Sequence, residues 1–436
     1  MSHNSKGSPT KNFRAGRAAP GWLPAATAVR ACSLEAMAQN DSPVSNPAQP
    51  AASGRYAGSA LVLGGGGARA AYHAGFLRRL GELQPGLHFP ILTGVSAGAI
   101  NTASLASGRA NFAVNAARLA EFWENITAEQ VFRADWAALG LNMLRWFGRL
   151  VGGGTPLAST TRSLMDTGPL RAFLSPPLAR DGGRLLGVAE NIRRGRIDAV
   201  ALVTTNYATG VSTSWVESRR ITSWIRPGRC GLPADLTLDH VMASASLPLF
   251  FPAVKLANAW HGDGGVRLQA PFSPAIHLGA QRIVALSTRP LRPHYEADPV
   301  QPLPYPSPAS VIGLLLDAVF LDAVEQDELH LRRVNALART RDTIAEGALR
   351  RVELLVVRPS VDLAPMARKY EAELPRAFRF ATRGLGTREA AQSELLATLM
   401  FNSGYVREVM AIGARDAEAR HREIAAFLAG ETPVGF

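Results

Sequence analysis

The chain has 436 residues, of which 47% are hydrophobic and 19% are charged, so it can bury a sizeable core in one large domain or two smaller ones. Two cysteines are too few for a disulfide framework. The net charge of +12 comes mainly from scattered arginines. No zinc finger, basic zipper or RNP motif accompanies them, so we expect no nucleic-acid partner, whereas contact with acidic lipid headgroups is compatible with this charge.

The N-terminal segment differs from the rest of the chain. Residues 1–56 contain six prolines and show no sustained periodicity, which predicts a disordered leader. Order is expected to begin at 59–63, which has strand character. A run of four glycines follows, and 68–80 has a helical pattern. A strand, a glycine loop and a helix in succession are typical of the start of an α/β fold.

Short apolar runs recur further along the chain and predict strands at 89–93, 199–204, 253–256, 282–287 and 351–357. Helical segments separate them. This order predicts a three-layer α/β/α sandwich with a largely parallel central sheet. After Pro359 the pattern stays helical to the end, which predicts a C-terminal helical extension over 361–436. No stretch of about 18 apolar residues is present, so we expect no membrane-spanning helix.

The segment Trp136–Gly154 is strongly apolar, and its only charges are Arg145 and Arg149. These two arginines are four residues apart and would share one face of a helix. The segment is either a lid or interfacial helix that enters lipid, or a core helix whose arginines reach solvent.

The glycine run Gly64–Gly67 precedes Arg69 between a predicted strand and a predicted helix. Exposed backbone N–H groups at such a helix start bind anions. A dinucleotide site would need an acidic residue about 20 positions later, and the region 83–90 has none. A phosphate-binding P-loop would need Gly-Lys-Ser/Thr at its end, and this loop continues as Gly-Ala-Arg instead. An oxyanion hole uses the same kind of N–H donors and remains as the interpretation.

Gly94-Val95-Ser96-Ala97-Gly98 follows an apolar run and precedes an alanine-rich segment. The pattern Gly-x-Ser-x-Gly at a strand-to-helix junction is typical of a sharp turn that exposes a serine nucleophile. The alternative is a serine that only caps the following helix.

A serine nucleophile needs a base, which is usually histidine. None of five histidines lies in a sequence context that marks it as the base: His73, His88, His240, His261 and His277. Asp263 lies between glycines after the strand-like stretch 252–260, where a carboxylate can reach a neighbouring loop. Asp181 also precedes two glycines, but it follows a polar, proline-containing stretch and is expected in a surface turn.

Taken in order, these motifs resemble those of the patatin-like phospholipase family. The resemblance spans residues 61–287 and rests on GGGGARAAYHAG, GVSAGAIN and DHVMASASLPLFFPAV followed by HGDGGVRLQAPFSPAIHLGA. It implies the α/β/α sandwich, with a patatin-like catalytic core over 61–274 and the remainder of the α/β domain over 275–360. Ala70, Gly64 and Gln269 depart from the residues frequent in the family, and none of them affects the implied catalytic pair.

The resemblance implies a Ser–Asp dyad without a catalytic histidine, in which Ser96 is the nucleophile and Asp263 the base. The N–H groups of Gly65, Gly66 and Gly67 would form the oxyanion hole. Supporting positions are Arg69, Gly94, Gly98, Gly264 and Gly265.

The implied function is a lipid acyl hydrolase of the phospholipase A, lysophospholipase or esterase type, acting on carboxylic esters. Its substrate would be a lipid or phospholipid, and neither a metal nor a cofactor is required. We expect a cytoplasmic protein that contacts the membrane surface peripherally. A lipid acyltransferase with the same dyad and a non-catalytic lipid-binding protein are the alternatives.

Overall fold

The computed structural model describes residues 56–133, 163–219, 223–290, 311, 313–315, 322–339, 350–374, 379 and 394–431. The predicted leader, apart from Tyr56, and the apolar segment Trp136–Gly154 lie outside the described residues.

In this part of the chain, ten strands form one sheet in the order β10-β9-β1-β2-β3-β4-β6-β5, and β8 pairs with β3 and β7. The strands are β1 (Ser59–Leu63), β2 (Ile91–Val95), β3 (Ala199–Asn206), β4 (Ser212–Ser218), β5 (Trp224–Arg226), β6 (Arg229–Pro233), β7 (Val254–Leu256), β8 (Ala259–Asp263), β9 (Arg282–Leu286) and β10 (Glu353–Val357). The five strands from β10 to β3 in this order are parallel to one another.

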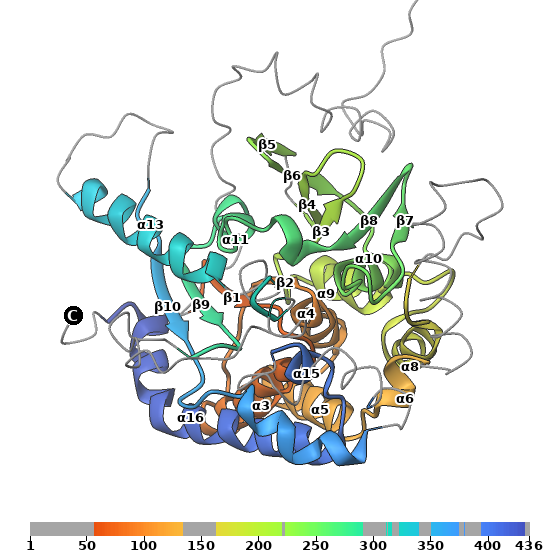
Figure 1. Ribbon diagram of the computed structural model, residues 1–436. Helices are drawn as coiled ribbons and strands as arrows, with labels where there is room; N and C mark the ends of the chain where they lie inside the picture. Colours follow the sequence, from red (N-terminus) through yellow and green to blue (C-terminus); the bar gives the residue numbers. More distant parts are fainter. Residues whose placement is uncertain are drawn as a thin grey trace, which may run out of the picture.

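The helices connect the strands and cover the sheet (Figure 1). The α-helices are α3 (Ala71–Leu83), α4 (Ala97–Ser107), α5 (Phe112–Glu124), α6 (Ala128–Val131), α8 (Gly168–Leu178), α9 (Leu186–Arg193), α10 (Leu238–Ser244), α11 (Ser273–His277), α13 (Asp322–Arg339), α15 (Glu394–Leu399) and α16 (Ser403–Ala429). The 3₁₀ helices in the described ranges are η1 (Gly67–Ala70), η2 (Gly264–Arg267) and η3 (Pro365–Glu373).

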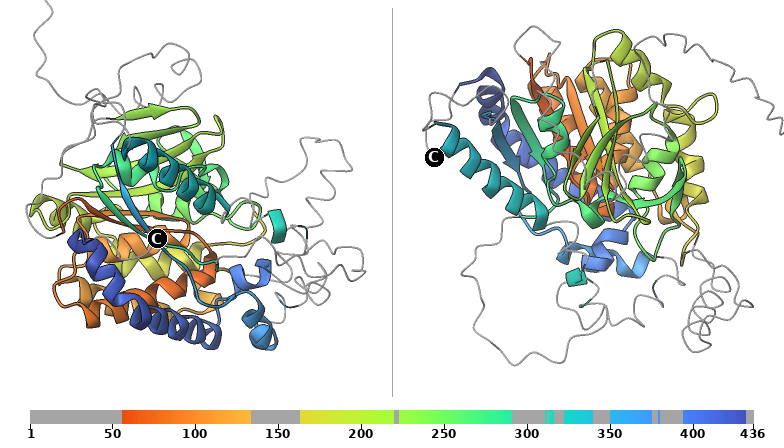
Figure 2. Two further views of the ribbon diagram at one scale, coloured as in Figure 1. Left: turned by 90° about the vertical axis from the view of Figure 1, so that its left-hand side faces the viewer. Right: turned by 90° about the horizontal axis from the view of Figure 1, so that it is seen from above.

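The two faces of the sheet bury different sets of side chains, because successive residues of a strand point to opposite faces. Leu61 and Leu63 of β1 belong to a large apolar core that also contains buried residues of α3, α5 and α16. Ala60 and Val62 belong to a second core, which includes Leu331 of α13. Figure 2 shows α13 on one side of the sheet and α3 and α16 on the other. The three-layer α/β/α prediction is therefore confirmed.

The C-terminal helices are present as predicted, and they pack on the rest of the fold. Helix α16 lies along α3, where the buried Tyr72 hydroxyl donates to the Asp416 carboxylate at 3.0 Å. Helix α15 contacts η1 through the ion pair between Arg69 and Glu394. The division of the chain at residues 274 and 360 stays a prediction.

Several element boundaries differ from the predictions. The strand expected at 89–93 is Ile91–Val95, because Pro90 has no N–H to donate to a sheet ladder. The strand-like stretch 252–260 is divided between β7 and β8, with Ala257 in the left-handed region at φ 50° between them. Strands β4, β5 and β6 were not predicted. For β4 the reason is that its buried part is rich in serine and threonine.

Candidate active site

Ser96 lies at the junction between β2 and α4, with φ 57° and ψ −132°, a conformation that non-glycine residues rarely adopt. The glycines on either side of Ser96 allow this turn, because the backbone at these positions lies too close to other backbone atoms for a side chain to fit. A Cβ atom on Gly94 would lie 2.4 Å from the Gly98 carbonyl oxygen, and one on Gly98 would lie 2.3 Å from the Leu63 carbonyl oxygen. Both distances are shorter than any tolerable contact, so this turn requires glycine at both positions.

The strand register explains how Asp263 reaches Ser96. Strand β2 pairs with β3 as far as Val95, opposite Val203, and then turns away into α4. Strand β8 runs antiparallel to β3 and places Asp263 opposite Thr204, the next residue of β3. Strand β4 pairs with β3 on one side. Strands β2 and β8 therefore share the opposite side of β3, where the end of β2 meets the end of β8. Ser96 and Asp263 are the residues at this meeting point.

The two side chains form a short hydrogen bond, in which the Ser96 hydroxyl donates to Asp263 Oδ2 at 2.6 Å. The other carboxylate oxygen, Oδ1, accepts from the Gly265 N–H at 2.9 Å. A Cβ atom on Gly264 would lie 2.2 Å from the Val203 carbonyl oxygen, so both glycines after Asp263 have a local role.

Asp263 is fully buried. Burial raises the pKa of its carboxyl group from 3.8 to about 7, while the hydrogen bonds from Ser96 and Gly265 oppose this shift. A carboxylate with this pKa is a stronger base than an exposed aspartate and still ionises near neutral pH.

The alternative roles of the serine and the histidines do not fit this geometry. Ser96 is the N-cap residue of α4, but its side chain makes no capping hydrogen bond. Within the described ranges, no histidine is hydrogen-bonded to Ser96 or Asp263. His261 instead bonds the Thr204 hydroxyl at 3.0 Å, and burial lowers its pKa to about 4. Asp181 lies in an exposed turn before α9, as predicted.

The glycine loop passes directly beside the serine. A Cβ atom on Gly65 would lie 3.1 Å from the Ser96 Cβ atom, and Gly66 and Gly67 have φ values of 142° and 57°. The described part of the chain provides no hydrogen-bond acceptor for the backbone N–H groups of Gly65, Gly66 or Gly67. Among the described residues, no acceptor therefore competes with a ligand for these three donors, and Gly67 lines the pocket beside Ser96.

Arg69 is buried and binds other parts of the protein. Its guanidinium group forms an ion pair with Glu394, donates to the Thr398 hydroxyl at 3.2 Å, and donates through Nε to the Gly66 carbonyl at 3.3 Å. Of the two roles that the sequence leaves open, ordering of the loop therefore fits this position, and contact with a substrate phosphate does not.

Ser244 at the end of α10 contacts the site but has no role in the sequence prediction. Its hydroxyl accepts from the Ser96 N–H at 3.0 Å and donates to the Val203 carbonyl at 2.6 Å. Its position inside the block ASASLPLFFP was the available signal. Glu394 and Thr398 were missed as well, because they lie far from the motifs along the chain.

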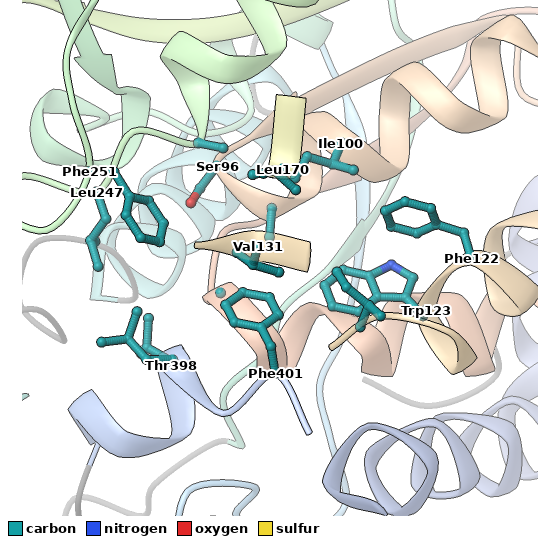
Figure 3. A pocket seen from close by; sticks show the side chains of 15 residues that line it. Ser96, Ile100, Phe122, Trp123, Val131, Leu170, Leu247, Phe251, Thr398 and Phe401 are labelled. Atoms are coloured by element: carbon teal, nitrogen blue, oxygen red, sulfur yellow. The ribbon is translucent and has the colours of Figure 1, made fainter. Parts of the chain in front are cut away.

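An apolar pocket of about 510 Å³, including the part open to solvent, lies in front of the serine. Figure 3 shows the Ser96 side chain at its wall, with Trp123 and Phe122 on one side and Phe251 on the other. Further apolar residues line it: Ala97, Ile100, Ile126, Val131, Leu170, Ala245, Leu247, Leu399 and Phe401. The pocket suits a hydrocarbon chain attached to a group that reacts at Ser96.

A family model described as patatin-like phospholipase matches residues 61–276. These residues form a patatin-like phospholipase domain. Two solved structures are similar to this chain. VipD from Legionella pneumophila has 12% identity and a TM-score of 0.32, with 85% of this chain and 73% of that chain covered.

The human GIVD cytosolic phospholipase A2 in complex with methyl gamma-linolenyl fluorophosphonate has 13% identity and a TM-score of 0.37, with 86% of this chain covered. This chain spans 59% of that human protein, which is less than two thirds of its length. No curated protein matches the sequence. Among the described residues, no helix is long and apolar enough to cross a membrane.

Proposed function

We propose that the protein is a lipid acyl hydrolase in which Ser96 is the nucleophile and Asp263 the base. The observation that carries the proposal is the 2.6 Å hydrogen bond between Ser96 Oγ and Asp263 Oδ2 at the wall of an apolar pocket. Membership of the patatin-like phospholipase family supports a lipid ester as the substrate.

In the first half of the reaction, Asp263 accepts the Ser96 hydroxyl proton as Oγ attacks the ester carbonyl carbon. The carbonyl oxygen becomes an oxyanion, which the N–H groups of Gly65, Gly66 and Gly67 stabilise. When the tetrahedral intermediate collapses, the carbon–oxygen bond to the alcohol breaks and the alcohol takes the proton from Asp263. The acyl group remains on Ser96.

In the second half, Asp263 accepts a proton from water, and the resulting hydroxide oxygen attacks the acyl carbon. Collapse of this intermediate releases the fatty acid and returns the proton to Ser96 Oγ. An acyltransferase would use an alcohol in place of this water. No metal or cofactor enters either half, because the base, nucleophile and oxyanion donors are all supplied by the chain.

The acyl chain of the substrate would lie in the apolar pocket. Leu249 is 59% exposed, and it lies along the chain between Leu247 and Phe251, which line the pocket. Large exposed apolar side chains near a lipid-binding pocket favour contact with a lipid surface. We therefore propose an enzyme that acts at the membrane surface, and its cytoplasmic location stays a prediction.

The test is turnover of a panel of carboxylic esters and phospholipids by the wild type and by Ser96→Ala, in the presence and absence of an acceptor alcohol. Ser107→Ala is a matched control, because Ser107 lies on the same helix and its hydroxyl has no hydrogen-bond partner in the described structure. We expect loss of turnover in Ser96→Ala only. Equal turnover in wild type and Ser96→Ala would refute the proposed nucleophile, and transfer to the alcohol at the expense of fatty acid would favour the acyltransferase.

A further inference from the structure

Two carbonyl groups of the glycine loop are held by buried side chains. The Gly65 carbonyl accepts from the buried Thr288 hydroxyl at 2.8 Å. The Gly66 carbonyl accepts from Arg69, through Nε at 3.3 Å and through the backbone N–H at 3.2 Å. Both contacts fix the orientation of a peptide plane.

The orientation of each carbonyl determines where the next N–H points. In a planar trans peptide, the C=O of one residue and the N–H of the next point in opposite directions. The Gly66 N–H is therefore directed away from Thr288, and the Gly67 N–H is directed away from the Arg69 side chain. These are two of the three N–H groups for which the described residues offer no acceptor.

A glycine loop needs such restraints, because glycine populates positive and negative φ with similar ease. Gly66 and Gly67 both have positive φ, at 142° and 57°. If a peptide plane between them reversed, a carbonyl oxygen would replace an N–H donor. That oxygen would repel a developing oxyanion instead of stabilising it.

We propose that Thr288 and Glu394 are positioning residues that keep these two peptide planes in the donor orientation. This inference rests on the proposed acyl hydrolase function. Thr288 acts directly on the Gly65 carbonyl, and Glu394 acts through the buried ion pair with Arg69. Neither residue lines the pocket beside Ser96, so neither touches the substrate.

The position of Glu394 extends the site beyond the patatin-like domain. Glu394 begins α15, which lies outside residues 61–276. The same helix supplies Thr398, whose hydroxyl accepts from Arg69 and whose carbonyl oxygen would lie 2.1 Å from a Cβ atom on Gly67. Helix α15 therefore fixes both the Arg69 side chain that holds the loop and the loop backbone at Gly67.

The sharpest test compares Thr288→Val, which keeps the shape of the side chain and removes the donor, with Thr288→Ser, which keeps the donor. Thr237→Val is the control, since it removes a threonine hydroxyl that contacts His240 at the start of α10, away from the glycine loop. The measurements are kcat and KM on an ester substrate, the affinity for a trifluoromethyl ketone that forms a tetrahedral adduct, and the affinity for a fatty acid.

For Thr288→Val we expect kcat and ketone affinity to fall by about 10- to 100-fold, somewhat less than the loss of a whole oxyanion donor, while KM and fatty-acid affinity change little. Thr288→Ser should restore most of the loss, and Thr237→Val should leave both affinities unchanged. Glu394→Gln should lower kcat and ketone affinity in the same way, at the cost of some stability, because Arg69 loses its charged partner.

Two failures can be told apart. A wild type without Ser96-dependent turnover would overturn the proposed function and this inference together. A wild type with such turnover, and a Thr288→Val variant with unchanged kcat and ketone affinity, would overturn only the positioning role. A loss of fatty-acid affinity as large as the loss of ketone affinity would also overturn it, because that pattern indicates general damage to the site.

Discussion

Replacing Asp263 by asparagine should make the fold more stable above neutral pH, although it removes the proposed activity. Asp263 has no contact with solvent, and its pKa rises from 3.8 to about 7 because burial disfavours the charged carboxylate. An ionised carboxylate in this position is destabilising, and an enzyme that needs it as a base accepts lower stability at its active site.

The sign and size of the effect follow from the two pKa values. The folded protein holds the Asp263 proton more tightly than the unfolded chain, so the contribution of this group to stability is most favourable below pH 4 and falls as the pH rises towards 7. Above pH 7 the loss no longer grows. The rise of the pKa from 3.8 to about 7 corresponds to a decrease in the free energy of unfolding on the order of 4 kcal/mol. An asparagine side chain does not ionise, so the Asp263→Asn variant does not lose this stability as the pH rises.

The assay is urea unfolding of wild type and Asp263→Asn at several pH values between 4 and 8. We expect the advantage of the variant to be small near pH 4 and to grow to several kcal/mol at pH 8, on the order of the difference given by the two pKa values. Ser96→Ala provides a control, because it removes the neighbouring hydroxyl and keeps the carboxylate. A stability difference between Asp263→Asn and wild type that does not change with pH would refute the assigned pKa.

Three further predictions concern activity. Because Asp263 must be ionised to accept a proton, kcat/KM should fall about tenfold per pH unit below about pH 7 and level off above it, and a profile flat down to pH 5 would contradict this. Phe401 stacks on Trp123 at the pocket wall, so Phe401→Leu should shift the preferred acyl chain towards longer esters in a chain-length series, and an unchanged profile would contradict it. Ser244→Ala leaves the Ser96 N–H without an acceptor, which should cost about 1–3 kcal/mol in urea unfolding and lower kcat, and wild-type values of both would contradict it.

The sequence predicts the parallel half of the fold well because its strands are short continuous apolar runs. Strands β1, β3 and β9 begin at the predicted residues, since both faces of these strands are covered and most of their residues are apolar or small. Strand β4 has a different character, because its buried serine and threonine side chains do not produce an apolar pattern. Its burial depends on pairing with β3 and β6, which only the tertiary structure reveals.

The candidate site divides in the same way between local and distant signals. Ser96 and Asp263 lie in glycine-rich turns whose local pattern is visible, and the structure brings them together through the end-to-end meeting of β2 and β8. Thr288 and Glu394 have no local pattern, because they act through contacts with residues more than 200 positions away. The sequence therefore predicts the groups proposed for the chemistry but not those that hold the loop.

The central claim is that Ser96 attacks the ester under the action of Asp263, and covalent labelling tests it most directly. The folded protein is treated with an alkyl fluorophosphonate, and the modified residue is located by mass spectrometry of its peptides. We predict a single adduct on Ser96, absent from Ser96→Ala and formed much more slowly in Asp263→Asn, with Ser107→Ala labelled at the wild-type rate. A folded wild-type protein that is not modified at Ser96, or an adduct on another residue, would contradict the account.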